Sequence, residues 1–219
     1  MRFKEKGDAM LASGAAHKAL ACYVQAVQVD PTNAAYSLAI AEAAKAKMTQ
    51  LIVAGTDISE EALPAILQQV RDNSIVTLDL STCQIKEQGA VELARALGSC
   101  PTVVKLSLHH NDVGDQGCHQ LAKMLVRHPS LTKLELHETK ITTAGVKFLA
   151  AALRRNTVLV HLDIGFNALG DEGVGHIAEA VQFNVNSKLT FLRLSGTGIG
   201  DAAADALGKM LIYNNSLTQ

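Results

Sequence analysis

Apolar residues recur along most of this chain in one pattern that is repeated six times. From Met48 onward, each copy reads L-x-x-L-x-L-x-x-(N/C/T)-x-(I/L/V), followed by apolar residues at helical spacing. The copies start near residues 48, 75, 103, 131, 159 and 189, and a seventh copy is cut off at 217. A fixed period in this range predicts stacked strand-plus-helix units rather than a single globular core.

Each unit predicts a short strand, a turn and a helix. Alternate strand residues point inward, and the residues between them point outward. We expect the polar residue at the turn to bond to loop backbone that would otherwise be buried unpaired. These turn residues are Thr56, Cys83, Asn111, Thr139, Asn167 and Thr197.

The helices of these units should pack closely against the layer of strands. We expect a small residue wherever a helix passes near its strand. The residues at these positions are Gly89, Gly117, Gly145 and Gly173. The helix residues expected to face the core are Leu93/Leu97, Leu121/Leu125, Leu149/Leu153, Ile177/Val181 and Leu207/Leu211.

Residues 1–47 follow a different pattern, which predicts a purely helical unit. Gly7 allows two helices to approach closely, and Tyr23 fills the groove between them. The Asp-Pro pair at 30–31 ends the second helix, and a third helix is predicted over about 34–47. The stretch RFKEKGDAMLASGAAHKALACYVQAVQVDP resembles a tetratricopeptide repeat. We expect this unit to cover the first leucine-rich unit as a cap, because the ends of a solenoid need one.

The repeats themselves resemble the ribonuclease-inhibitor-type leucine-rich repeats over about residues 48–219. This resemblance implies an α/β fold: a right-handed curved solenoid with a parallel sheet on its concave side and helices on its convex side. Members of this class usually bind proteins across the concave sheet, and they include the activating protein of the Ran GTPase. Because one scaffold serves many partners, the resemblance predicts the fold and leaves the partner open.

Outward-pointing strand residues define the expected concave face, since folding does not demand their identities. Equivalent residues of neighbouring units should lie one strand spacing apart, roughly 4.8 Å. The candidate protein-binding residues on this face are Lys105, His109, His110, Lys133, Glu135, His137, Glu138, His161, Asp163, Phe166, Phe191 and Arg193.

Four of the eight histidines of the chain are expected to gather in the middle of this face beside three acidic residues. They are His109, His110, His137 and His161, and the acidic residues are Glu135, Glu138 and Asp163. Imidazole and carboxylate groups can ligate a divalent transition metal. They can also make partner binding depend on pH, because histidine titrates near about pH 6.5. We expect these side chains to make polar contacts with a partner, and we keep metal binding and pH-dependent partner binding as alternatives.

Two aromatic residues, Phe166 and Phe191, are predicted near the C-terminal end of the same face, close to Arg193. Aromatic residues and arginine are the usual anchors of protein interfaces. For Phe191 the alternative is packing on the adjacent loop. Phe166 lies between a glycine and the turn asparagine, and it is the stronger candidate.

Charge and cysteine content narrow the possible partners. Twenty basic residues against 21 acidic ones give a net charge of −1, which favours neither nucleic acid nor anionic lipid. We expect no membrane-spanning segment, because no apolar run is long enough. The four cysteines show no paired spacing, which predicts a reduced, cytoplasmic environment. Cys118, near a helix start, is predicted to be the most reactive of them.

The function predicted from these features is a non-enzymatic scaffold or regulator that binds a protein on its concave sheet and needs no cofactor. One alternative is a GTPase-activating protein related to the Ran regulator, which a GTP turnover assay would reveal. Another is a hydrolase that uses a metal in the histidine cluster, although a flat sheet gives it no cleft. The repeat pattern continues into the last residues, so we expect either a longer natural chain or self-association through the C-terminal repeat.

Overall fold

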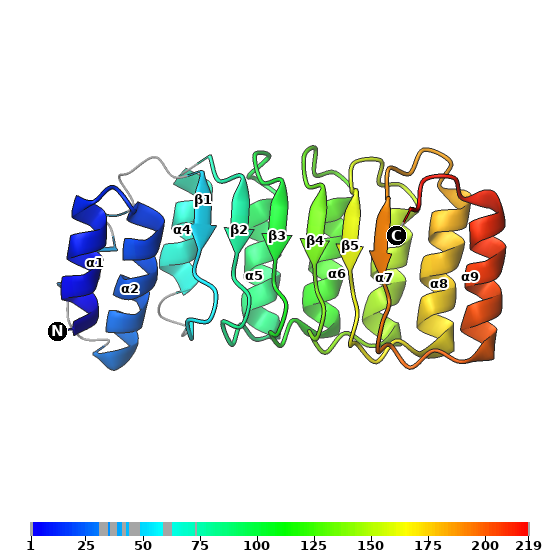
Figure 1. Cartoon of the computed structure of the whole chain (residues 1–219), viewed down its shortest axis with the longest axis horizontal. Helices are drawn as coiled ribbons and strands as arrows, with labels where there is room; N and C mark the ends of the chain where they lie inside the picture. Colours follow the sequence, from blue (N-terminus) through cyan, green and yellow to red (C-terminus); the bar gives the residue numbers. More distant parts are fainter. Residues whose placement is uncertain are drawn as a thin grey trace.

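The chain forms one continuous row of units in a computed structural model, which describes residues 2–30, 35, 39–40, 43, 49–58, 63–72 and 74–218. Two helices, α1 (Arg2–Ala12) and α2 (Ala16–Val29), begin the row. After them, strands and helices alternate, with the strands in one layer and the helices in a second layer behind it (Figure 1).

Six parallel strands form a single sheet in the order β1-β2-β3-β4-β5-β6, so each strand pairs with the next one along the chain. This is the fold class predicted from the repeats. The strands are β1 (Gln50–Ile52), β2 (Thr77–Asp79), β3 (Lys105–Ser107), β4 (Lys133–Glu135), β5 (His161–Asp163) and β6 (Phe191–Arg193). The helices between and after them are α4 (Leu63–Asp72), α5 (Glu87–Leu97), α6 (Gly114–Leu125), α7 (Thr143–Leu153), α8 (Gly170–Phe183) and α9 (Asp201–Tyr213).

The inward leucines of the strands fill the space between the two layers. The central residues of β1 to β5 are all 1% exposed or less: Leu51, Leu78, Leu106, Leu134 and Leu162. They belong to one hydrophobic core that runs from α2 to α9. At the far end, Leu211 is 58% exposed although it was predicted to face the core, because no described element packs against the outer side of α9.

The side chains of five turn residues bond to backbone as predicted: Cys83, Asn111, Thr139, Asn167 and Thr197. Asn167 Oδ1 accepts the N–H groups of Thr139 and Ile141, each at 3.0 Å. Its Nδ2 donates to the carbonyls of Leu136 at 2.8 Å and Ile164 at 3.0 Å. Asn167 therefore joins two successive units. Thr139, the turn residue of the preceding unit, donates from its Oγ1 to the Leu136 carbonyl.

The helix glycines lie at a close contact, but the expected partner was wrong. A Cβ on Gly117 would lie 2.9 Å from the Cβ of Ala90 in α5, and a Cβ on Gly173 would lie 3.0 Å from Val146 in α7. These glycines let successive helices approach each other rather than bringing a helix close to its own strand. The helices meet at these glycines because equivalent positions of stacked units face one another.

Helices α1 and α2 pack on each other at the glycine identified from the sequence. A Cβ on Gly7 would collide with the ring of Tyr23, which is fully buried and donates a hydrogen bond to Asp8 Oδ1 at 2.8 Å. Helix α2 lies against β1. The third helix predicted over about 34–47 falls mostly outside the described residues. Among the described helices, none is long and apolar enough to cross a membrane.

Candidate functional site

The sheet face, meaning the outward residues of β1 to β6 together with the second and third residues after each strand, has the register predicted from the sequence. Lys105, Lys133, His161 and Phe191 form one row of paired residues, and Ser107, Glu135, Asp163 and Arg193 form another. The ladder continues beyond the strands, with His110 N–H donating to the His137 carbonyl at 3.1 Å and Phe166 N–H to the Ser195 carbonyl at 2.7 Å. This face corresponds to the predicted concave face.

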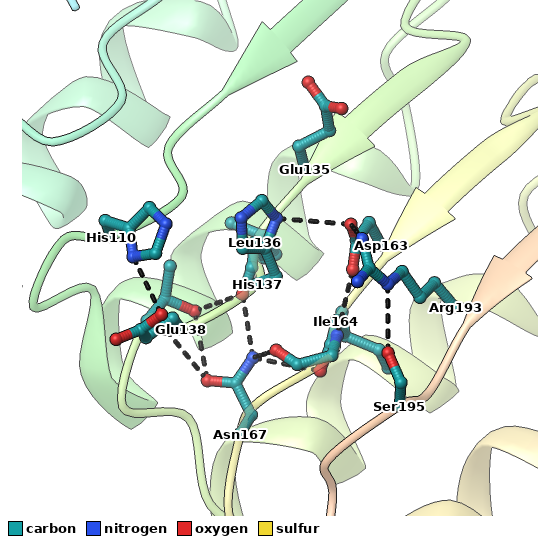
Figure 2. Close-up of polar contacts among 12 residues, drawn as sticks. His110, Glu135, Leu136, His137, Glu138, Asp163, Ile164, Asn167, Arg193 and Ser195 are labelled. Carbon is teal, nitrogen blue, oxygen red and sulfur yellow. Dashed lines mark hydrogen bonds and ion pairs between the residues drawn. The ribbon is translucent and has the colours of Figure 1, made fainter.

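Asp163 was expected to be an accessible residue of this face, but it is only 4% exposed. Its Oδ1 accepts the Gly165 N–H at 3.0 Å, and its Oδ2 lies 3.2 Å from His137 Nδ1 and 3.5 Å from Arg193 Nη1 (Figure 2). Side chains of both neighbouring units therefore cover the carboxylate. Asp163 orients His137 and Arg193 and is not available to a partner.

Three of the four predicted histidines come together, and the fourth does not. The ring centroids of His109 and His137 are 4.3 Å apart in a stacked arrangement, and His110 meets both rings edge-on at 5.0 Å and 5.1 Å. His161 instead stacks on Phe191 at 4.0 Å, with ring planes 4° apart. Phe191 thus packs on a residue of the neighbouring strand.

Each of two cluster histidines has a carboxylate at its Nδ1 atom. Glu138 Oε2 lies 2.8 Å from His110 Nδ1, and Asp163 lies beside His137 Nδ1 without the alignment of a hydrogen bond. His109 Nδ1 is buried and has no hydrogen-bond partner. Desolvation, followed by the nearby His137 and His110, lowers the pKa of His109, so this ring favours its neutral form.

Phe166 and Arg193 form the second feature of the face. Phe166 is 52% exposed, and the guanidinium carbon of Arg193 lies 5.8 Å from the centre of its ring. Arg193 is held in place by Ser195, whose Oγ accepts from Nε at 2.9 Å, and by Asp163. The remaining predicted residues are simpler: Lys133 pairs with Glu135 at 2.9 Å, and Lys105 is exposed.

One property of the face was missed from the sequence. The third residue after each strand has a positive φ in every unit, between 53° and 73°. Glycine occupies this position at both ends of the array, but the middle units carry larger side chains there: Thr82, His110, Glu138 and Phe166. Gly55 and Gly196, at this position in the first and last units, could have indicated the left-handed conformation from the sequence, because glycine alone adopts it without strain.

The cysteine prediction is overturned by burial. All four cysteines are buried and unpaired by disulfides. Cys118, a residue of α6 that was expected to be the most reactive, is fully buried, and burial raises the pKa of its thiol to about 12. A thiol with this pKa has almost no reactive thiolate near neutral pH.

Comparisons with known proteins agree with the repeat architecture. A family model described as Leucine Rich repeat matches residues 71–94, 99–122, 155–178 and 185–208. The chain is similar to the structure of leiomodin-1 actin-binding site 2, with 20% identity, a TM-score of 0.54, and coverage of 70% of this chain and 91% of that chain. For an internalin, inlF of Listeria monocytogenes str. 4b F2365, the identity is 20%, the TM-score 0.43, and the coverage 78% and 55%. Among curated proteins, no sequence matches this chain.

The family match and the likeness to the leiomodin-1 structure join two observations already made, the repeated sequence pattern and the six-stranded parallel sheet backed by helices. Together they show that this chain has the fold of a leucine-rich-repeat solenoid.

Proposed function

We propose that this chain is a non-enzymatic module that binds a protein partner across its sheet face, as an intracellular scaffold or regulator. The observation that carries the proposal is Phe166, a half-exposed aromatic side chain at a left-handed backbone position beside Arg193. Nothing in the packing of the repeat requires phenylalanine there.

Keeping phenylalanine at this position has a cost to the folded state. An L-residue in the left-handed region is less stable than glycine by about 1–2 kcal/mol. The neighbouring column member Gly196 is glycine, and a Cβ there would lie 2.6 Å from the Phe166 ring, so Gly196 also makes room for that ring. Strained residues of this kind concentrate at functional sites, which supports a role for Phe166 in recognition.

Phe166 and Arg193 also have the chemistry of an interface centre. Aromatic residues and arginine dominate the binding energy of protein interfaces, and they act best where their geometry is fixed beforehand. Asp163 and Ser195 fix Arg193 from below, while Phe166 remains open to solvent. The charged residues around this pair carry both signs, which suits complementary contacts with a protein.

A capture experiment with matched variants tests this proposal. The chain contains a second pair of the same kind on its helix side, where Arg154 lies 5.1 Å from the ring centre of Phe183, which is 53% exposed. Phe166→Gly and Phe183→Ala therefore remove equally exposed aromatic groups from opposite sides.

The immobilised full chain and both variants would be exposed to the same cell extract, after circular dichroism has shown that all three are folded. We expect a protein that is retained by the wild type and by Phe183→Ala but lost by Phe166→Gly. A protein that is lost only by Phe183→Ala would place recognition on the helices and refute the proposal.

A further inference from the structure

Three imidazole rings from two neighbouring units meet at the carboxyl ends of β3 and β4. We propose that His109, His110 and His137 form a binding site for one divalent transition metal ion of the zinc, cobalt, nickel or copper class. This site is independent of the proposed partner binding, because it would be filled in the isolated chain.

The spacing of the three rings is the first observation. One ring nitrogen of each histidine lies within 4.8 Å of the corresponding nitrogens of the other two. Around a tetrahedral zinc ion with bonds of about 2.1 Å, ligand nitrogens lie roughly 3.4 Å apart. Binding would therefore draw the ligand nitrogens closer by at most about 1.4 Å, through side-chain rotations.

The second observation is the pair of carboxylates behind the rings. Glu138 lies 2.8 Å from His110 Nδ1 and Asp163 lies 3.2 Å from His137 Nδ1, so the Nε2 atom of each ring is left for a ligand. In Figure 2 Asp163 lies on the side of His137 that is away from His110, and Glu138 lies below His110. Histidines that bind metals usually have a carboxylate or carbonyl at their other nitrogen, which fixes the ring and raises its basicity.

His109 supplies the third observation. Its Nδ1 atom is buried, and no hydrogen-bond partner satisfies it. A buried polar nitrogen without a partner is costly to the folded state, and coordination of an ion would remove that cost.

The ligand set indicates the class of ion and the shape of the site. Imidazole nitrogens suit zinc, copper, nickel and cobalt, whereas magnesium and calcium prefer oxygen ligands. Three protein ligands leave a fourth position free on a tetrahedral ion. The His110 side chain is 42% exposed, so this position would open toward solvent on the sheet face.

Isothermal titration of the full chain with zinc chloride near pH 7.5 tests this proposal. We expect one ion to bind per chain, and we expect the dissociation constant to rise at least tenfold in His110→Gln and in His137→Gln. His161→Gln is the matched control, since His161 lies on the same face but stacks on Phe191 outside the cluster. Its affinity for zinc should equal that of the wild type.

A second variant separates a built site from adventitious binding to surface histidines. Glu138→Gln keeps all three imidazoles and removes only the carboxylate behind His110, and we expect it to weaken zinc binding about tenfold. Because Glu138 is exposed, this substitution should leave the unfolding midpoint without metal unchanged. Absence of binding at millimolar zinc, or an equal loss of affinity in His161→Gln, would overturn the proposal.

Discussion

His128 should make the stability of this chain depend on pH. The ring is 5% exposed, its Nε2 lies 3.1 Å from the Cys100 carbonyl, and its Nδ1 accepts the Leu131 N–H at 3.1 Å. Both contacts are satisfied only by the neutral ring with its proton on Nε2. A second proton on Nδ1 would point at the Leu131 N–H, so protonation in the folded state is unfavourable.

The sign of the pH effect follows from the pKa. Burial lowers the pKa of His128 in the folded chain, while in the unfolded chain the residue titrates near about 6.5. Below that pH the unfolded chain binds more protons than the folded chain, so the free energy of unfolding falls as the pH falls. For one group the slope is at most about 1.4 kcal/mol per pH unit, and it vanishes above the unfolded pKa.

The repeat itself provides the matched substitution. One period later, Asn156 makes contacts of the same kind: its Nδ2 donates to a carbonyl of the preceding unit, that of Leu125 at 2.8 Å, and its Oδ1 accepts the N–H groups of Val158 and Leu159. His128→Asn should therefore keep a bond to a carbonyl of the preceding unit and the bond from the Leu131 N–H, without a titrating group. His109 and His161, whose pKa values are also lowered by desolvation, remain in both proteins and cancel in the comparison.

Urea unfolding of the wild type and His128→Asn between pH 8 and pH 5.5 measures the difference. We expect it to be constant above about pH 7 and to change below about pH 6.5 in favour of the asparagine variant, by up to about 1.4 kcal/mol per pH unit. Parallel curves over the whole range would show that His128 does not resist protonation, and would refute this reasoning.

Three further outcomes follow from the packing. Phe166→Gly should be more stable than Phe166→Ala by about 1 kcal/mol in urea unfolding, because only glycine relaxes at φ 53°; equal stabilities would contradict the strain argument. Asn167→Ala should lower the free energy of unfolding by about 2–5 kcal/mol, because it leaves the Thr139 and Ile141 N–H groups without their acceptor. A thiol reagent should modify no cysteine quickly in the native chain and all four after denaturation; fast native labelling of Cys118 would disprove its burial.

The sequence allowed the sheet to be predicted residue by residue, because residues that pair between neighbouring strands of a repeat lie one period apart in the sequence. Once the period was read, the neighbour of Lys105 in the next strand had to be Lys133, and the next had to be His161. The same periodicity shows His128 in one column with Asn156 and Asn184, a signal that was present in the sequence and was overlooked.

The side-chain contacts on the sheet face could be predicted less well from the repeat register. The register predicted that four histidines lie close together on the face, but rotamers decided that His161 stacks on Phe191 and leaves the cluster. Asp163 has an outward backbone position and is nevertheless buried, since long side chains of the neighbouring units reach over it. The period cannot specify how far a side chain extends or which way it turns.

The sequence by itself therefore determined the period, the inward leucines, the bonding of the turn asparagines and the order of the strands. These follow from hydrophobic burial and backbone hydrogen bonding, which act alike in every unit. Only the tertiary structure decided which glycines touch which helix, which side chains occupy left-handed positions, and which three imidazoles converge. Those features depend on the particular shapes of neighbours about 28 residues away, and they differ from one unit to the next.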